Sequence, residues 1–127
     1  AGRRVIRAKD FENEYYIALG PTTPSKFRMD DLFSRASVPR NIRAETPLSE
    51  IACGMVASGA GVSVVDPFTA AEFATRGVVA RPFEPAVEFQ VTALYPARRT
   101  LSAMGREFIA EFAVAIHEFR GTFRPAR

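Results

Sequence analysis

Three places in the sequence pair a helix-capping residue with a proline: Thr23-Pro24, Thr46-Pro47 and Asp66-Pro67. Threonine and aspartate accept hydrogen bonds from free N–H groups at a helix N-terminus. Proline fits the first helical position because its missing N–H would have no partner there. The pairs therefore predict three helix N-termini, where free N–H groups and the helix dipole favour a carboxylate or a phosphate.

Hydroxyl side chains accompany all three predicted N-termini and add hydrogen-bond donors and acceptors: Thr22, Thr23, Ser25, Thr46, Ser49 and Thr69. Asp66, followed by Pro67, is the one carboxylate expected at these junctions. A single junction is most simply a helix cap, worth about 1 kcal/mol of stability. Three junctions at one edge of a sheet would instead form a small-molecule site, and the residues alone leave both interpretations open.

Apolar runs of strand length alternate with helical periods along the chain. The runs predict strands at Tyr15–Leu19, Asn41–Glu45, Val62–Val65, Val78–Phe83 and Phe89–Tyr95. The helical periods predict helices around Met29–Ala36, at Leu48–Ser58 with Gly59 as its C-terminal cap, at Phe68–Thr75 and at Leu101–Phe119. Such alternation is typical of βαβ units, so we predict an α/β fold with a mixed, mostly parallel sheet flanked by helices on both faces. Right-handed crossovers would place the three junctions together at the carboxyl edge of that sheet.

The last predicted helix carries an apolar stripe at helical spacing: Met104, Phe108, Phe112, Ile116 and Phe119. The surface that this stripe forms must find another chain, bend back onto the sheet, or remain exposed. Exposed apolar patches beyond a few hundred Å² are uncommon in monomers, so we expect this helix to promote self-association.

The residue types most often used in catalysis and cofactor binding do not form a pattern here. His117 lies far from any candidate nucleophile and is predicted to be a surface residue, and Cys53 is predicted to be a packed side chain without basic neighbours. Gly59-Ala60-Gly61 lacks the third glycine of a dinucleotide fingerprint and leads into a strand, and Asp30-Asp31 is interpreted as a solvated helix face. We therefore predict no enzyme activity, no cofactor and no metal site.

A phosphorylated receiver domain is a natural alternative, since Asp66 follows the third of the predicted strands. That chemistry needs acidic residues after the first strand to hold magnesium. The first clear strand ends instead in Leu19-Gly20-Pro21-Thr22, so the receiver interpretation is set aside.

Composition indicates one ordinary globular domain or a piece of a larger one. The 127 residues are 47% hydrophobic and 24% charged, and no apolar run approaches the roughly 20 residues that span a bilayer. The net charge of +3 comes from the termini, because residues 10–118 hold ten basic and fourteen acidic residues. We therefore expect a soluble, cytoplasmic chain that does not itself bind nucleic acid or a membrane.

Four segments of the sequence resemble the LysR-type transcriptional regulators. Met55–Pro67, with its glycines before an apolar strand, is the most specific of them. Asp10–Leu19 is similar to the family's entry strand, Glu45-Thr46 to the strand end before its glycine-containing helix, and Leu101–Phe108 to its closing helix. Asp66 departs from the apolar residue found there in many members, and Val65–Ala70 looks like the branch that senses amino acids and opines.

The resemblance implies one lobe of a type 2 periplasmic-binding-protein-like fold that senses an effector. Residues 1–99 would be the second lobe of the effector-binding domain, and residues 100–127 a helix returning to an absent first lobe. The implied partners are a small-molecule effector in the interlobe cleft, further copies of the protein, and DNA through an N-terminal winged helix-turn-helix outside this chain. A lobe of a transporter's solute-binding protein is the alternative with the same architecture.

Overall fold

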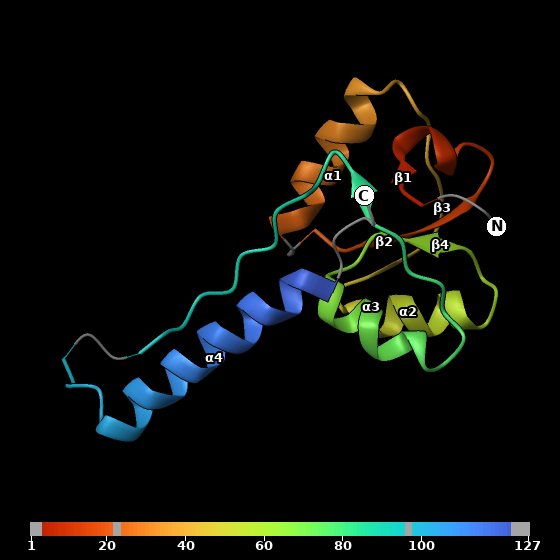
Figure 1. Ribbon diagram of the computed structural model, residues 1–127. Coiled ribbons are helices and arrows are strands. Elements are labelled where there is room, and N and C mark those ends of the chain that lie inside the picture. The colour runs from red at the N-terminus through yellow and green to blue at the C-terminus, as the bar shows by residue number, and fades with distance from the viewer. Residues whose placement is uncertain (1–3, 22–23, 96–97, 123–127) are drawn as a thin grey trace. The chain divides into compact units, whose positions relative to one another are not determined.

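The computed structural model describes residues 4–21, 24–95 and 98–122 (Figure 1). The chain divides into two compact units, residues 1–89 and 90–127. The first unit holds every described strand, and the second holds one long helix.

A three-stranded parallel sheet lies at the centre of the first unit. β2 (Tyr15–Leu19) is the middle strand, with β3 (Asn41–Thr46) on one side and β4 (Val62–Ser63) on the other. The sequence predicted all three strands and their parallel direction, although β4 is shorter than expected. Residues Tyr16–Ala18 are buried, as expected for a continuous apolar run in the middle strand of a parallel sheet with helices on both faces.

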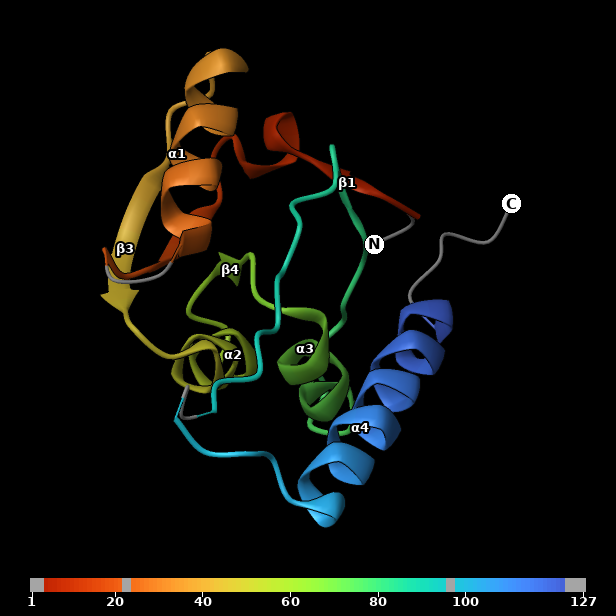
Figure 2. The ribbon, with the colours of Figure 1, turned by 90° about the vertical axis from the view of Figure 1, so that its left-hand side faces the viewer.

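Helices cover both faces of this sheet, as predicted. α1 (Pro24–Arg35) lies on one side of the strands, and α2 (Ser49–Ala57) and α3 (Pro67–Ala74) lie on the other (Figure 2). Beneath α1, the rings of Phe11 and Phe33 meet edge to face with centroids 5.2 Å apart, and Phe11 meets Tyr16 in the same way at 5.6 Å. This aromatic cluster is the main core of the unit.

Two glycines fix the connection from α2 to β4. At Gly59 (φ 80°) the helix ends in a Schellman turn, in which the N–H of Gly59 donates to Val56 and the N–H of Ala60 donates to Met55. Gly61 lies against β2, and a Cβ atom at this position would collide with the carbonyl oxygen of Tyr15. The predicted cap at Gly59 is confirmed, and the requirement for glycine at position 61 comes from close backbone packing.

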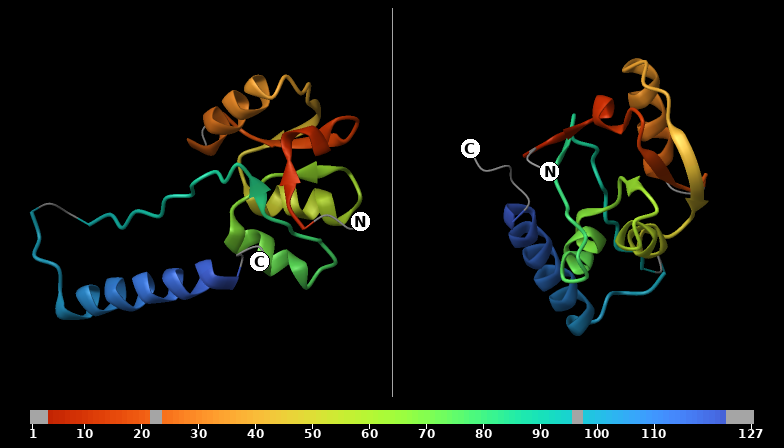
Figure 3. Two further views of the ribbon diagram at one scale, coloured as in Figure 1. Left: turned by 45° about the horizontal axis from the view of Figure 1, so that its top comes forward. Right: turned by 90° about the vertical axis from the view of Figure 1, so that its right-hand side faces the viewer.

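The segment after α3 differs from the prediction. The strand predicted at Val78–Phe83 is wrong, and among the described residues after α3 only Phe83–Glu84 forms a strand (β5). β5 pairs in parallel with β1 (Ile6–Arg7), which leads into a 3₁₀ turn (η1, Ala8–Phe11) that was not predicted (Figure 3). Pro82 and Pro85 bracket β5 and remove two backbone donors, which limits it to two residues. Residues 89–95 are not a strand, since they find no strand to pair with among the described residues.

The second unit is dominated by α4 (Ala103–Thr122), close to the predicted helix. The rings of Phe108 and Phe112 stack with centroids 5.8 Å apart, and both side chains are exposed. His117 is also exposed, as expected. None of the described helices is both long enough and apolar enough to cross a bilayer.

Candidate functional site

Asp66 caps α3, as its junction with Pro67 predicts. The backbone N–H of Thr69 donates to Oδ1 of Asp66 at 2.9 Å, and the Thr69 hydroxyl donates to Oδ2 at 2.9 Å. Pro67 is the first helical residue, and Thr69 is buried. The carboxylate is therefore held in one orientation at the N-terminus of α3, with lone pairs left on both oxygens.

Thr46 does not cap α2, so the predicted cap at Thr46-Pro47 is wrong. Thr46 is the last residue of β3, where it pairs with Leu19 and accepts a hydrogen bond from the N–H of Gly20 at 2.8 Å. This pairing keeps Thr46 in the strand, and α2 begins three residues later at Ser49. The Thr46 hydroxyl is buried and accepts only a long 3.4 Å contact from the N–H of Leu48, the actual N-cap residue.

The structure describes some of the remaining predicted site residues and not others. Ser49 is the first residue of α2 and is partly buried. Pro24 begins α1, which agrees with the first predicted junction, and Ser25 follows it in the helix. Thr22 and Thr23 lie outside the described residues, as does the side chain of Ser25.

The sheet brings the described junctions to one edge. β2 and β3 end side by side, because Leu19 pairs with Thr46, and β4 ends beside Ile17 just before the Asp66 junction. Asp66 also lies close enough to α2 for its negative charge to act on Cys53. Burial raises the pKa of the Cys53 thiol, and the charges of Asp66 and then Glu50 raise it further. Cys53 is therefore a protonated, packed thiol rather than a nucleophile.

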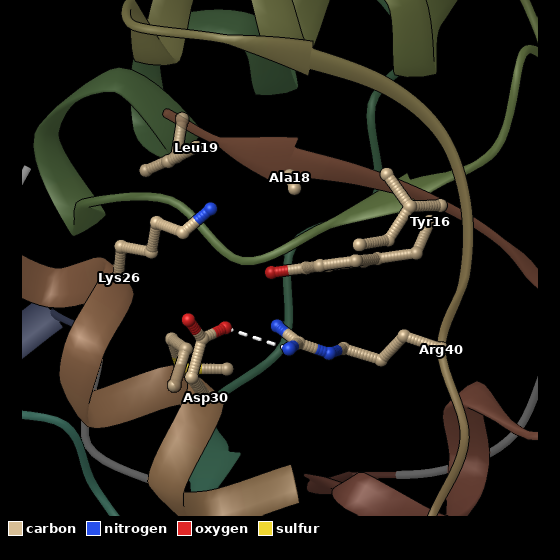
Figure 4. A pocket seen from close by; sticks show the side chains of 8 residues that line it. Tyr16, Ala18, Leu19, Lys26, Asp30 and Arg40 are labelled. Carbon is tan, nitrogen blue, oxygen red and sulfur yellow. Dashed lines mark ion pairs between the residues drawn. The ribbon is translucent and has the colours of Figure 1, made fainter. Parts of the chain in front are cut away.

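A hollow of about 80 Å³ lies elsewhere, between α1 and the strands, and contains none of the predicted site residues (Figure 4). Its polar groups are Tyr16, Lys26, Asp30 and Arg40. Asp30 is not simply a solvated residue, since its Oδ1 atom lies 2.6 Å from Nη2 of Arg40. The sequence offered one unused signal, the (i, i+4) spacing of Lys26 and Asp30 on one helix face. Arg40 joins them only through the tertiary fold.

No group of three or more histidine, cysteine or acidic side chains suited to a metal ion occurs among residues 4–21, 24–95 and 98–122. The polar groups described at the strand-end edge are the Asp66 carboxylate, the hydroxyls of Thr46, Ser49 and Thr69, and backbone N–H groups. Such groups bind and orient a small polar molecule.

The family model for the LysR substrate binding domain matches residues 1–115. The chain belongs to this family. Its parallel strands flanked by helices agree with the periplasmic-binding-protein-like type 2 fold, and the resemblance to LysR-type regulators is confirmed.

Two curated relatives are regulatory proteins. The chain is 38% identical over 108 residues to the transcriptional activator protein LysR of Escherichia coli (strain K12), covering 85% of this chain and 35% of that protein. It is 30% identical over 114 residues to the regulatory protein NocR of Agrobacterium tumefaciens (strain T37), covering 90% of this chain and 38% of that protein. The chain thus spans little more than a third of the length of these relatives.

Proposed function

We propose that this chain is the effector-sensing part of a bacterial LysR-type transcriptional regulator and not an enzyme. Its ligand is a small carboxylate-containing metabolite, an amino acid or an opine-like molecule. The ligand binds at the carboxyl edge of the sheet, in a cleft between two lobes, and controls the conformation of a DNA-bound oligomer. The names of both relatives favour a regulator over the solute-binding protein of a transporter.

The observation that supports this ligand class is the fixed carboxylate of Asp66 at the start of α3. Backbone N–H groups at the first turns of α1 and α2 suit the ligand carboxylate. The hydroxyls that the sequence predicts for this site, those of Thr22, Ser25, Thr46 and Ser49, are proposed to add donors. Asp66 suits a ligand ammonium or guanidinium group. A purely anionic ligand would be repelled by Asp66, which gives the site its preference for a zwitterion.

The deciding experiment measures ligand affinity in the full-length regulator, because half of a cleft binds weakly. Asp66→Asn is the sharpest variant, since its amide oxygen still accepts from the N–H of Thr69 and preserves the cap while removing the charge. We expect Asp66→Asn to weaken the binding of basic amino acids and opines at least tenfold, as for lost hydrogen bonds to a charged group. The binding of simple carboxylates should not weaken and should become slightly tighter, because the repulsion by Asp66 is removed. If Asp66→Asn weakened the binding of basic ligands and of simple carboxylates equally, Asp66 would be only a helix cap and not a ligand-binding residue.

The division of the chain supports a matching assignment of its parts. We assign residues 1–99 to the second lobe and residues 100–127 to the segment that returns to a first lobe outside this chain. The compact units divide somewhat earlier, after residue 89. DNA would be read by a winged helix-turn-helix that lies outside the chain, in a cytoplasmic homo-oligomer.

The apolar face of α4 provides a test of this assignment. Met104 is 79% exposed and Phe108 is 66% exposed, and in the whole regulator we expect the first lobe to cover this face. The 127-residue chain alone should therefore self-associate at high concentration in light scattering, and Phe108→Glu should make it monomeric. A wild-type chain that stays monomeric throughout would contradict this role for α4.

A further inference from the structure

The hollow beside α1 has the size of a site for a small group. Its volume is about 80 Å³, and it is bounded by Tyr16, Ala18 and Leu19 of β2, Lys26, Met29 and Asp30 of α1, Arg40, and Ile42 of β3. One water molecule needs about 10–15 Å³ by the same measure, whereas sites for drug-sized ligands occupy roughly 300–1,000 Å³. The hollow therefore suits several waters or a group of a few heavy atoms.

Three hydrogen-bond donors converge on this space from different parts of the fold. The Tyr16 hydroxyl points between the Lys26 ammonium and the Arg40 guanidinium (Figure 4). Each donor belongs to a separate segment, namely β2, α1 and the residue just before β3. Donors of this kind, arranged around one point, suit an acceptor that carries negative charge.

Packing holds two of the donors in place. Tyr16 is only 2% exposed, and its ring lies 5.6 Å from that of Phe11 and 5.8 Å from that of Phe33. The Arg40 guanidinium stacks against the Phe33 ring at 5.1 Å, and its side chain is 19% exposed. Because these groups are already ordered, little conformational entropy is lost when they bind a ligand.

The carboxylates of the neighbourhood leave donors available. Asp30 engages Arg40 at 2.6 Å, but a guanidinium has five N–H donors. Lys26 contacts Glu45 at a longer 3.4 Å, in an ion pair that an incoming anion can replace. Burial also raises the pKa of Tyr16, with Arg40 opposing the shift, so its hydroxyl remains a donor at neutral pH.

We propose that this hollow binds the carboxylate group of a small molecule, held by Lys26, Tyr16 and Arg40. The apolar side chains of Met29 and Ile42 would contact the aliphatic part of the ligand. The hollow reaches the strand-end edge at Leu19, but none of its residues is among those assigned to the effector, and the Asp66 cap of α3 is not part of it. For a ligand as small as acetate, the few contacting atoms imply a dissociation constant of about 1–10 mM.

The two lysines of the chain make a direct test possible. Lys26 lies at the hollow, and Lys9 is exposed in η1. We would titrate the 127-residue chain with acetate against chloride at constant ionic strength, and follow both lysine side chains by NMR. The Lys26 signals and the amides of Ala18 and Leu19 should shift and saturate, whereas the Lys9 signals should not. Parallel, unsaturated shifts of both lysines would overturn the proposal.

Matched variants separate binding from stability. Lys26→Gln should weaken acetate binding about tenfold, as for the loss of a hydrogen bond to a charged group, and Lys9→Gln should leave it unchanged. Glu45→Gln should strengthen binding about two- to five-fold, because it removes the internal competitor for Lys26. Backbone amide spectra would confirm that each variant is folded.

Two further results would overturn the proposal: an unchanged affinity for acetate in Lys26→Gln, or weaker binding of acetate in Glu45→Gln. Asp66→Asn should not affect acetate binding in this chain. The outcome is therefore independent of the effector test on the full-length regulator.

Discussion

The junctions at Asp66-Pro67 and Thr46-Pro47 have the same sequence pattern but different structures. After β4, pairing stops at Ser63, so Asp66 is free to turn its side chain back onto Thr69 and begin α3. In β3, pairing with β2 continues through Thr46, whose carbonyl oxygen accepts a hydrogen bond from the N–H of Gly20. Thr46 stays in the strand, three residues before the start of α2 at Ser49, so its hydroxyl reaches only the N–H of Leu48. The end of the neighbouring strand therefore decides where each helix begins.

The largest effect should come from breaking β4, on which the Asp66 junction depends. A Cβ atom at Gly61 collides with the backbone of Tyr15, so Gly61→Ala must displace β4 from β2. We expect a loss of about 3 kcal/mol in the free energy of unfolding, measured by urea denaturation.

Gly54→Ala is the matched control for this substitution. Gly54 lies inside α2 with no atom within 4 Å of its missing Cβ, so alanine should stabilise the chain by about 0.5–1 kcal/mol. A Gly61→Ala chain as stable as wild type would show that β4 does not depend on this contact.

Removing the Asp66 cap of α3 should have the next largest effect on the free energy of unfolding. Asp66→Ala loses both hydrogen bonds from Thr69 and should cost about 1–2 kcal/mol of unfolding free energy, because a buried hydroxyl and a helix N–H lose their acceptors. Asp66→Asn should cost less than half of that amount in the same urea titration. If Asp66→Ala and Asp66→Asn lose the same unfolding free energy, the stabilisation comes from the charge of Asp66 and not from its capping hydrogen bonds.

Sequence patterns predicted those parts of the fold that depend on local signals. The buried apolar run at Tyr15–Leu19, the cap at Gly59 and the first turn at Pro67 each needed only their own neighbours to be recognised. The strands expected after Val78 were wrong for the opposite reason. A strand needs a partner, and only Phe83–Glu84 found one, in the unpredicted β1.

The candidate sites follow the same rule. Asp66 was identified because a cap is a local motif, and Thr46 was misassigned because its strand partner is 27 residues away at Leu19. The hollow at Tyr16, Lys26 and Arg40 was missed because three segments of the fold supply its donors. No periodicity in a single segment reveals such a convergence.

A smaller effect should follow from changing Thr46, if it is a strand residue and not a cap. Thr46→Val keeps the shape and the β propensity of the side chain and removes only the long 3.4 Å contact from Leu48. We expect a loss of no more than about 0.5 kcal/mol in unfolding free energy, since bonds of this length contribute little. A cost as large as that of Asp66→Ala would show that the Thr46 hydroxyl has a capping role after all.

The smallest effect should be an electrostatic shift in the pKa of Cys53. Its size depends on the distance between the Asp66 carboxylate and α2. Burial is the main cause of the raised pKa of Cys53, and the charge of Asp66 adds more to it than the charge of Glu50. Asp66→Asn should therefore lower the pKa of Cys53 slightly, Glu50→Gln should lower it less, and both should leave it above the ordinary value because the thiol remains buried. Thiolate absorbance during a pH titration, with a Cys53→Ala chain subtracted, measures this order directly. A larger shift in Glu50→Gln would place the Asp66 carboxylate farther from α2 than its capping geometry requires.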